Sequence, residues 1–197
     1  MRYGTIALLS ATALALAGCG HKEETTTTTN SVTAETGSTT VADTNIADNS
    51  VVAAPAGPGQ SFANTAAASD AFEIAESQLA ATSAHSAAIK SFAAKMIEAH
   101  TGSTAKLKTV TAGLSPALTP DATLTADQQQ KVDALKVKTG ADFDTAYVAD
   151  QVAAHQATLD ALKSYSTSGD VPALKTFATG LVPTVTAHLN MAQGLKP

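Results

Sequence analysis

The stretch IKSFAAKMIEAHTGSTAKLKTV, from Ile89 to Val110, carries the pattern that decides the fold. One series of side chains recurs at steps of three and four residues: Ile89, Phe92, Met96, His100, Ser103, Leu107 and Val110. Residues at this spacing lie on one face of an α-helix. Lysines and Glu98 flank or oppose that face. The stretch therefore predicts an amphipathic helix, from about residue 86 to 112, whose buried stripe includes a histidine.

The chain after residue 61 has further segments with helical periodicity and almost no strand signal. They run from about 62 to 83, 126 to 138, 142 to 166 and 171 to 193. We expect Gly140 to end the short helix as a C-cap and Asp142 to cap the next helix. Pro183 lies inside the last segment, where its missing N–H predicts a kink.

Two of these helices repeat one another. The segment KSFAAKMIEAH at 90–100 matches KTFATGLV at 175–182, which is followed by Ala187 and His188. A repeat of this kind favours two related helical hairpins. The connection from Gly113 to Gly140 is long enough to run the length of a bundle and to join them. The expected fold is all-α, a four-helix bundle with a short extra helix in the long connection between the two hairpins.

The N-terminus has the features of an export signal. Arg2 precedes an apolar run, Ile6 to Ala17, that is too short to span a membrane. The sequence LAGC at 16–19 resembles the lipobox of bacterial lipoproteins, which implies cleavage after residue 18 and lipidation of Cys19. The alternative is an ordinary signal peptide that ends in a cysteine by chance. Gly20 in place of aspartate implies, by the same resemblance, retention in the outer membrane.

The chain thus divides into three expected parts. Residues 1–18 form a lipoprotein signal peptide, and residues 19–60 combine the lipidated Cys19 with a Thr- and Ala-rich tether. This tether shows no sustained period, so we expect it to be disordered. Residues 61–197 form the helical bundle domain. The expected location is the outer membrane, with the domain facing the periplasm and the membrane bound through the N-terminal lipid.

The composition argues against several classes of function. Arg2 is the only arginine, there is no tryptophan, and acidic residues outnumber basic ones by 17 to 12. Nucleic-acid binding relies on basic patches, guanidinium forks and aromatic stacking, so nucleic acid is not an expected partner. Cys19 is the single cysteine, which excludes a disulfide within the chain.

Four motifs resemble a known bacterial family. They are FEIAESQLA at 72–80, IKSFAAKMIEAH at 89–100, FDTAYVADQVAAH at 143–155, and LKTFA at 174–178 with His188. In this order they are similar to the domain of unknown function 4142, over roughly residues 62–193. The resemblance implies a ferritin-like helical bundle in an exported protein. It implies no established activity.

A set of polar side chains shares the inward faces of the predicted helices: Glu73, Glu76, His100, Gln151, His155 and His188. Counting the helical rise from the short turns places Glu73, His100 and His155 near the midplane of the bundle. The same count places His188 one or two turns farther out. If the long connection crosses the bundle, His188 falls near the level of Glu76.

These inward groups have two interpretations. In one, Glu73, His100 and His155 hydrogen-bond one another and fix the register of the helices. In the other, they hold a single transition-metal ion such as zinc, iron, copper or manganese, with His188 or Glu76 as an outer ligand. A di-iron centre needs Glu-x-x-His motifs, and the chain contains none.

Two neighbouring residues have simpler expected roles. Tyr147 is expected in the core, and Asp144 is expected to stabilise the N-terminus of its own helix. Hydrolase triads, phosphate-binding glycine loops and zinc-protease motifs do not occur in the sequence. We therefore expect no catalytic residues and a periplasm-facing structural or binding module, with an envelope protein as its unidentified partner. A metal-binding or metal-dependent redox protein is the alternative.

Overall fold

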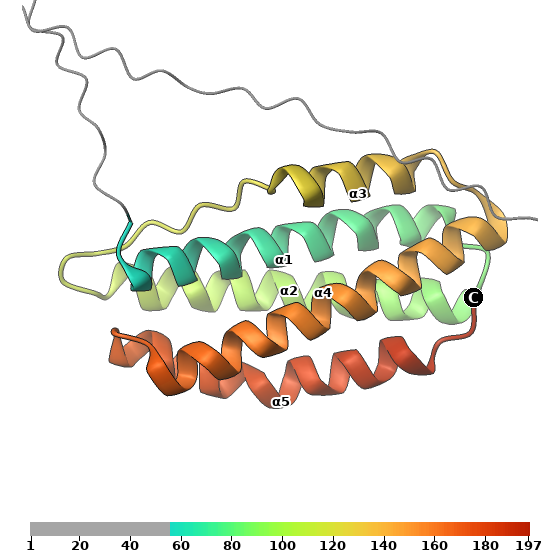
Figure 1. Cartoon of the computed structure of the whole chain (residues 1–197). Helices are drawn as coiled ribbons and strands as arrows, with labels where there is room; N and C mark the ends of the chain where they lie inside the picture. The colour runs from blue at the N-terminus through green and yellow to red at the C-terminus, as the bar shows by residue number, and fades with distance from the viewer. Residues whose placement is uncertain (1–55) are drawn as a thin grey trace, which may run out of the picture. The chain divides into compact units, whose positions relative to one another are not determined.

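The computed structural model describes residues 56–197. This part of the chain is all-helical (Figure 1), with the helices α1 (Pro58–Ser83), α2 (Ala87–Ala112), α3 (Ala126–Lys136), α4 (Gly140–Ser168) and α5 (Pro172–Gly194). The all-α prediction is confirmed. The predicted signal peptide, Cys19 and most of the tether lie outside the described residues.

The four long helices form a bundle of two hairpins (Figure 1). Helices α1 and α2 are antiparallel neighbours, and so are α4 and α5. The connection after α2 returns along the length of the bundle and carries α3 against α1, so that α4 begins at the end where α1 finishes. This is the crossover expected of a ferritin-like bundle. Among the described residues, no helix is both long and apolar enough to cross a membrane.

Local sequence explains most helix ends. Thr125 and Gln128 form a reciprocal capping box that starts α3. Helix α1 begins at Pro58, four residues earlier than the expected Phe62, because proline at the first helical position loses no hydrogen bond.

Two local expectations are corrected. Gly140 does not end α3 but begins α4, where its positive φ of 58° suits a residue without a Cβ atom. Thr139 takes the N-cap position expected of Asp142. Helix α5 is continuous through Pro183, whose side chain is exposed, and the kink expected there stays a prediction.

The carboxylate of Asp144 does not act on its own helix. Its two oxygens accept the backbone N–H groups of His85 and Ser86, at 2.9 and 2.8 Å. These N–H groups belong to the tight turn that leads into α2, and His85 itself is exposed there. Asp144 therefore ties the α1–α2 turn to the start of α4 and satisfies donors that the helix leaves without partners.

The apolar core has two clusters. One includes Phe62, Leu159 and Tyr165, near the start of α1 and the end of α4, and the rings of Phe62 and Tyr165 stack at 3.9 Å. The other includes Ile89 and Phe143, close to the α1–α2 turn and the start of α4. The residues between these two groups on all four helices include buried polar side chains, so the site described next has apolar packing on both sides.

Candidate metal centre

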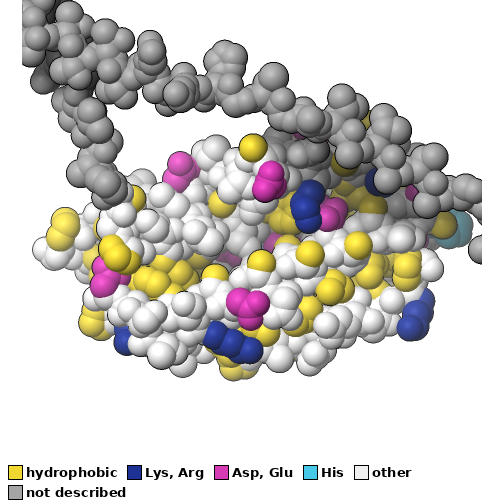
Figure 2. Space-filling view, viewed as in Figure 1, with side chains coloured by type: hydrophobic (Ala, Val, Ile, Leu, Met, Phe, Trp, Pro, Cys, Tyr) yellow, Lys and Arg dark blue, Asp and Glu magenta, His cyan; other side chains and the backbone are white. Residues whose placement is uncertain are grey.

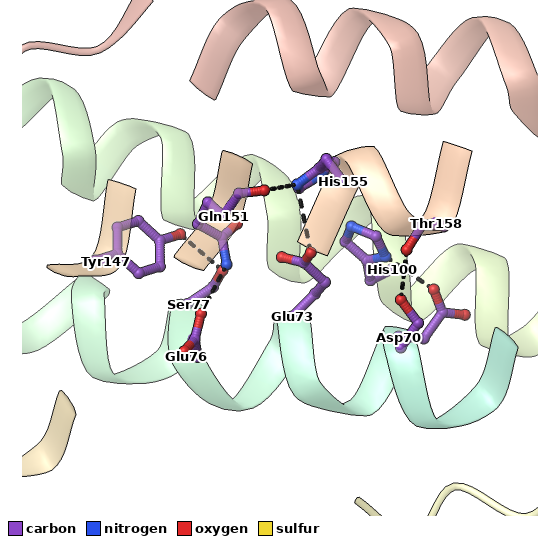
Figure 3. A network of polar contacts seen from close by, with 10 residues as sticks. Asp70, Glu73, Glu76, Ser77, His100, Tyr147, Gln151, His155 and Thr158 are labelled. Carbon is purple, nitrogen blue, oxygen red and sulfur yellow. Dashed lines mark hydrogen bonds and ion pairs between the residues drawn. The ribbon is translucent and has the colours of Figure 1, made fainter. Parts of the chain in front are cut away.

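All four long helices contribute to one buried polar band, and Figure 3 shows its members on α1, α2 and α4. Helix α1 places three carboxyl groups on one stripe, since residues three apart in a helix share a face. The buried members of the band are Asp70, Glu73, Glu76, His100, Gln151, His155 and His188. Apolar clusters flank this level of the bundle at both ends.

Three imidazole rings converge at the centre of the band. The ring centroids of His100, His155 and His188 lie 5.5 to 5.7 Å apart. Each ring has one nitrogen that lies within 4.8 Å of the corresponding nitrogens of the other two. The rings come from α2, α4 and α5, so tertiary packing alone brings them together.

The outer nitrogen of His100 is held by a carboxylate. His100 Nδ1 lies 2.8 Å from Asp70 Oδ1, and the hydroxyl of Thr104 donates to Asp70 Oδ2 at 3.1 Å. Because a carboxylate can only accept, the proton of a neutral ring sits on Nδ1. The Nε2 atom then has a lone pair available toward the other two rings.

His155 has a similar arrangement. Its Nδ1 atom donates to the backbone carbonyl of Gln151, one turn earlier, at 2.8 Å. Glu73 Oε1 lies 3.3 Å from the same atom. Burial lowers the pKa of His155 to about 4, and burial with a smaller contribution from Glu76 raises the pKa of Glu73 well above its usual value. The His155 ring is therefore neutral near pH 7.

Each of the three rings has one nitrogen without a partner. His100 Nε2, His155 Nε2 and His188 Nδ1 are buried, and none of them makes a hydrogen bond within the described part of the chain. Leaving a buried polar atom unpaired costs about 1–3 kcal/mol. Burial also lowers the pKa of His188 to about 4, so this ring too is neutral near pH 7.

A metal ion fits this set of donors. Metal–imidazole bonds of about 2.0–2.1 Å place ligand nitrogens roughly 3.4–3.6 Å apart in trigonal or tetrahedral sites. Nitrogens within 4.8 Å of one another therefore need to close by roughly 1 Å. Side-chain rotation is enough for such a movement, so the backbone already has the arrangement that three-nitrogen coordination requires.

The next level of the band is hydrogen-bonded. Gln151 Nε2 donates to Glu76 Oε2 at 3.1 Å, and the hydroxyls of Ser77 and Tyr147 lie 2.9 Å apart. Burial, with a smaller contribution from the nearby charge of Asp150, raises the pKa of Glu76 to about 8. Glu76 is therefore largely protonated at pH 7. These pairs join α1 to α4 and hold the two helices in register.

Asp150 completes this level at the surface. Its carboxylate pairs with Lys131 Nζ at 2.8 Å, and this hydrogen bond raises the pKa of the lysine. The pair joins α3 to α4, so the short helix of the long connection is fastened directly outside the carboxyl groups of the band.

The structure changes the expected partners. His188 was expected one or two turns from the other histidines, and that prediction is wrong because it lies in contact range of both. The rise count assumes level, parallel helices, whereas α4 crosses its neighbours obliquely in Figure 1. The closest partner of His100 is Asp70 rather than Glu73. Glu73 instead contacts His155, as expected for a midplane group.

Asp70 is the main residue that sequence reasoning missed. It lies one turn before Glu73 on the same stripe of α1, at the spacing that links Glu73 to Glu76. That spacing is the signal by which it could have been found. Thr104 follows His100 by one turn, and its role depends on Asp70.

Solved structures with a similar fold include CopM in two copper-bound forms. The Cu(I)-bound form aligns with a TM-score of 0.57 and 16% identity, covering 68% of this chain and 92% of CopM. The Cu(II)-bound form aligns with a TM-score of 0.59 and 16% identity, covering 68% and 93%. At this identity the likeness establishes the helical-bundle fold.

The amino-acid sequence gives a family assignment independent of these structures. No curated protein matches the chain. A family profile described as a domain of unknown function, DUF4142, matches residues 45–195. This match includes every helix of the bundle and all of the buried polar band, as the four sequence motifs predict, and the chain therefore belongs to the DUF4142 family.

Proposed function

We propose that the bundle binds one transition-metal ion through His100, His155 and His188. The observation that carries the proposal is the convergence of three buried ring nitrogens, none with a hydrogen-bond partner among the described residues. Two of the three rings are oriented by a hydrogen bond from the opposite nitrogen. This is the arrangement typical of histidines that bind metals.

Copper is the ion that we propose first. Neutral imidazoles suit copper, zinc, iron and nickel, and three of them suit an ion that accepts low coordination numbers. The structural likeness to CopM in its Cu(I)- and Cu(II)-bound forms supports copper as the first ion to test. Zinc is the comparison ion, since it also takes histidine ligands.

The surroundings favour binding of the ion over catalysis on a substrate. The cavity that reaches His100 and His188 has a volume of about 40 Å³. This space accommodates a metal ion or a water molecule but no organic substrate. We propose that the protein holds or buffers the metal and is not an enzyme.

We propose that this activity belongs to the bacterial envelope. The support for this proposal is the lipobox-like sequence that ends at Cys19. In the proposed arrangement Cys19 carries the lipid anchor, residues 19–60 form the tether, and residues 61–197 form a periplasmic domain at the outer membrane. Palmitate labelling of the full chain tests the anchor. Wild type should incorporate label, Cys19→Ala should not, and incorporation by both would contradict lipidation of this cysteine.

A second candidate function is a structural or protein-binding module of the envelope. The hydrogen bonds between Gln151 and Glu76, and between Tyr147 and Ser77, favour it, because they fix the helices without any ion. The two functions differ in what they predict for the three histidines. A purely structural set gains no stability from added metal.

Metal binding by the full chain, produced without a histidine tag, separates these functions. Competition with a Cu(I)-chelating dye and equilibrium dialysis with zinc should give one ion per chain. His155→Phe should abolish this binding. His85→Ala, at an exposed histidine in the α1–α2 turn, is the matched control and should retain it. Equal binding by wild type and His155→Phe would refute the proposal.

A further inference from the structure

A passage between α2 and α5 leads from the surface to the histidines. Its inner part is the cavity of about 40 Å³ that ends at His100 and His188. Its outer part is a surface groove of about 350 Å³ between the same helices. Both parts are lined by Ala99, Ser103, Leu181 and Thr184. The groove and the cavity are therefore adjacent, with these four residues between them.

The exposure of the three rings agrees with this direction of access. His188 is 8% exposed and His100 is 5% exposed, whereas His155 is 1% exposed. The two more exposed rings belong to α5 and α2, the helices that form the passage. Solvent therefore reaches the cluster from the α2–α5 side and meets His155 last.

The groove on the opposite side of the bundle also shares lining residues with the cavity, namely Ala66, Thr158 and Leu162. This apolar groove of about 390 Å³ lies between α1, α3 and α4 (Figure 2), and no histidine lines it among the described residues. Behind this groove the hydroxyls of Ser69 and Thr158 bond at 2.7 Å and bridge α1 to α4. The buried side chains of Phe72 and Leu162 form its apolar floor.

The α2–α5 passage also has suitable chemistry along its length. Glu98 lines the outer groove, and Asp70 lies at the inner end. Ser103 and Thr184 contribute hydroxyls at the neck, which is the boundary formed by the four residues that the groove and the cavity share. These oxygen atoms are poor ligands for Cu(I), so they would not retain the ion before it reaches the imidazoles. Lys95 and Lys106 also line the groove and offset the charge of Glu98. Passage is then controlled by the width of the neck rather than by long-range attraction.

We propose that the neck formed by Ala99, Ser103, Leu181 and Thr184 is the route by which the metal ion reaches and leaves the three histidines. The inference rests on the proposed function for its ligand. The choice of this side follows from the greater exposure of His188 and His100 and from the Ser69–Thr158 hydrogen bond that bridges α1 to α4 on the other side. The proposal assigns control of the exchange rate to residues that do not coordinate the ion.

Stopped-flow uptake of Cu(I) and its transfer to a chelator measure the two rates. In Thr184→Leu, whose position is exposed and tolerates a larger side chain, both rates should fall at least tenfold with the equilibrium affinity unchanged. Leu181→Ala should raise both rates. Ala157→Leu, in the opposite groove, is the matched control and should change neither. Unchanged rates in Thr184→Leu, or an equal slowing in Ala157→Leu, would overturn the route.

A second measurement needs no metal. The imidazole C2 hydrogens exchange slowly in heavy water, whose molecules are small enough for the cavity, and mass spectrometry of the full chain reports this deuterium labelling for each histidine separately. His188 and His100 should exchange faster than His155, and Thr184→Leu should slow both while exposed His85 exchanges as before. Wild type that binds no copper but shows this labelling pattern would refute the proposed function and retain the route. Copper binding with labelling unaffected by Thr184→Leu would refute the route alone.

Discussion

Replacing His188 by leucine separates a metal ligand from a structural histidine. His188 makes no hydrogen bond to another described residue, and its buried Nδ1 atom has no partner. Removing an unpaired buried polar atom raises the free energy of unfolding by about 1–3 kcal/mol. Imperfect packing of the leucine reduces this gain. We therefore expect the metal-free His188→Leu protein to unfold with the same free energy as wild type, or with up to about 2 kcal/mol more.

The same substitution should remove most of the effect of copper. At a free copper concentration of about 100 times the dissociation constant, binding stabilises wild type by about 2.7 kcal/mol. Loss of a residue that merely orients a metal ligand weakens metal binding by up to about 100-fold. Loss of one of the three ligands themselves should therefore weaken copper binding at least about 100-fold. At the same copper concentration the variant would then gain about 0.4 kcal/mol or less.

Thermal unfolding with and without copper measures both quantities. For a domain of this size 1 kcal/mol corresponds to roughly 4 °C, so copper should raise the Tm of wild type by about 10 °C and that of His188→Leu by no more than about 2 °C. Two results together would refute the reasoning: a metal-free variant destabilised by more than about 2 kcal/mol, and a copper-induced shift equal to that of wild type. His188 would then be a structural residue.

Three further predictions concern Asp70, Glu76 and Asp144. Asp70→Asn should weaken copper binding about 10- to 100-fold, because the amide no longer orients His100 as the carboxylate does. Chelator competition measures the affinity, and an unchanged affinity would contradict the role of Asp70. Folding raises the pKa of Glu76 to about 8, so between about pH 4.5 and 8 the folded protein binds one proton more than the unfolded chain. The free energy of unfolding therefore falls as the pH rises through that window. Glu76→Gln should remove this loss, which is up to about 5 kcal/mol, and urea unfolding at pH 5 and pH 9 should show a pH-dependent difference from wild type. Asp144→Ala should destabilise the metal-free protein by about 2–4 kcal/mol, since two N–H groups of the α1–α2 turn lose their acceptor, and a loss below about 0.5 kcal/mol would contradict that contact.

Sequence reasoning located the helices well because their signals are local. The stripe of Ile89, Phe92 and Met96 is a property of one segment, and all three residues are buried in α2. Helix ends were less accurate, as Gly140 illustrates. A glycine with positive φ can end one helix or begin another, and the surrounding chain decides between them.

The inward polar residues were partly predictable for the same reason. Helical spacing places Glu73, His100 and His155 on apolar faces, and all three are buried. Their partners were not predictable, because a partner depends on the offset and crossing angle of two helices that no single helix encodes. An offset of one turn moves a side chain by about 5.4 Å, which is enough to exchange one partner for another.

What the sequence by itself determined is the set of helices, the polar groups that each turns inward, and membership of a family of helical bundles. Periodicity is enough for this, since burial of an apolar stripe requires only that some partner helix exists. The tertiary structure alone decided that His188 joins His100 and His155, and that Asp70 holds His100. The reason is physical: contacts among α1, α2, α4 and α5 follow from how the side chains of all four helices pack together, and a shift of about one turn in any of them would separate the three nitrogens.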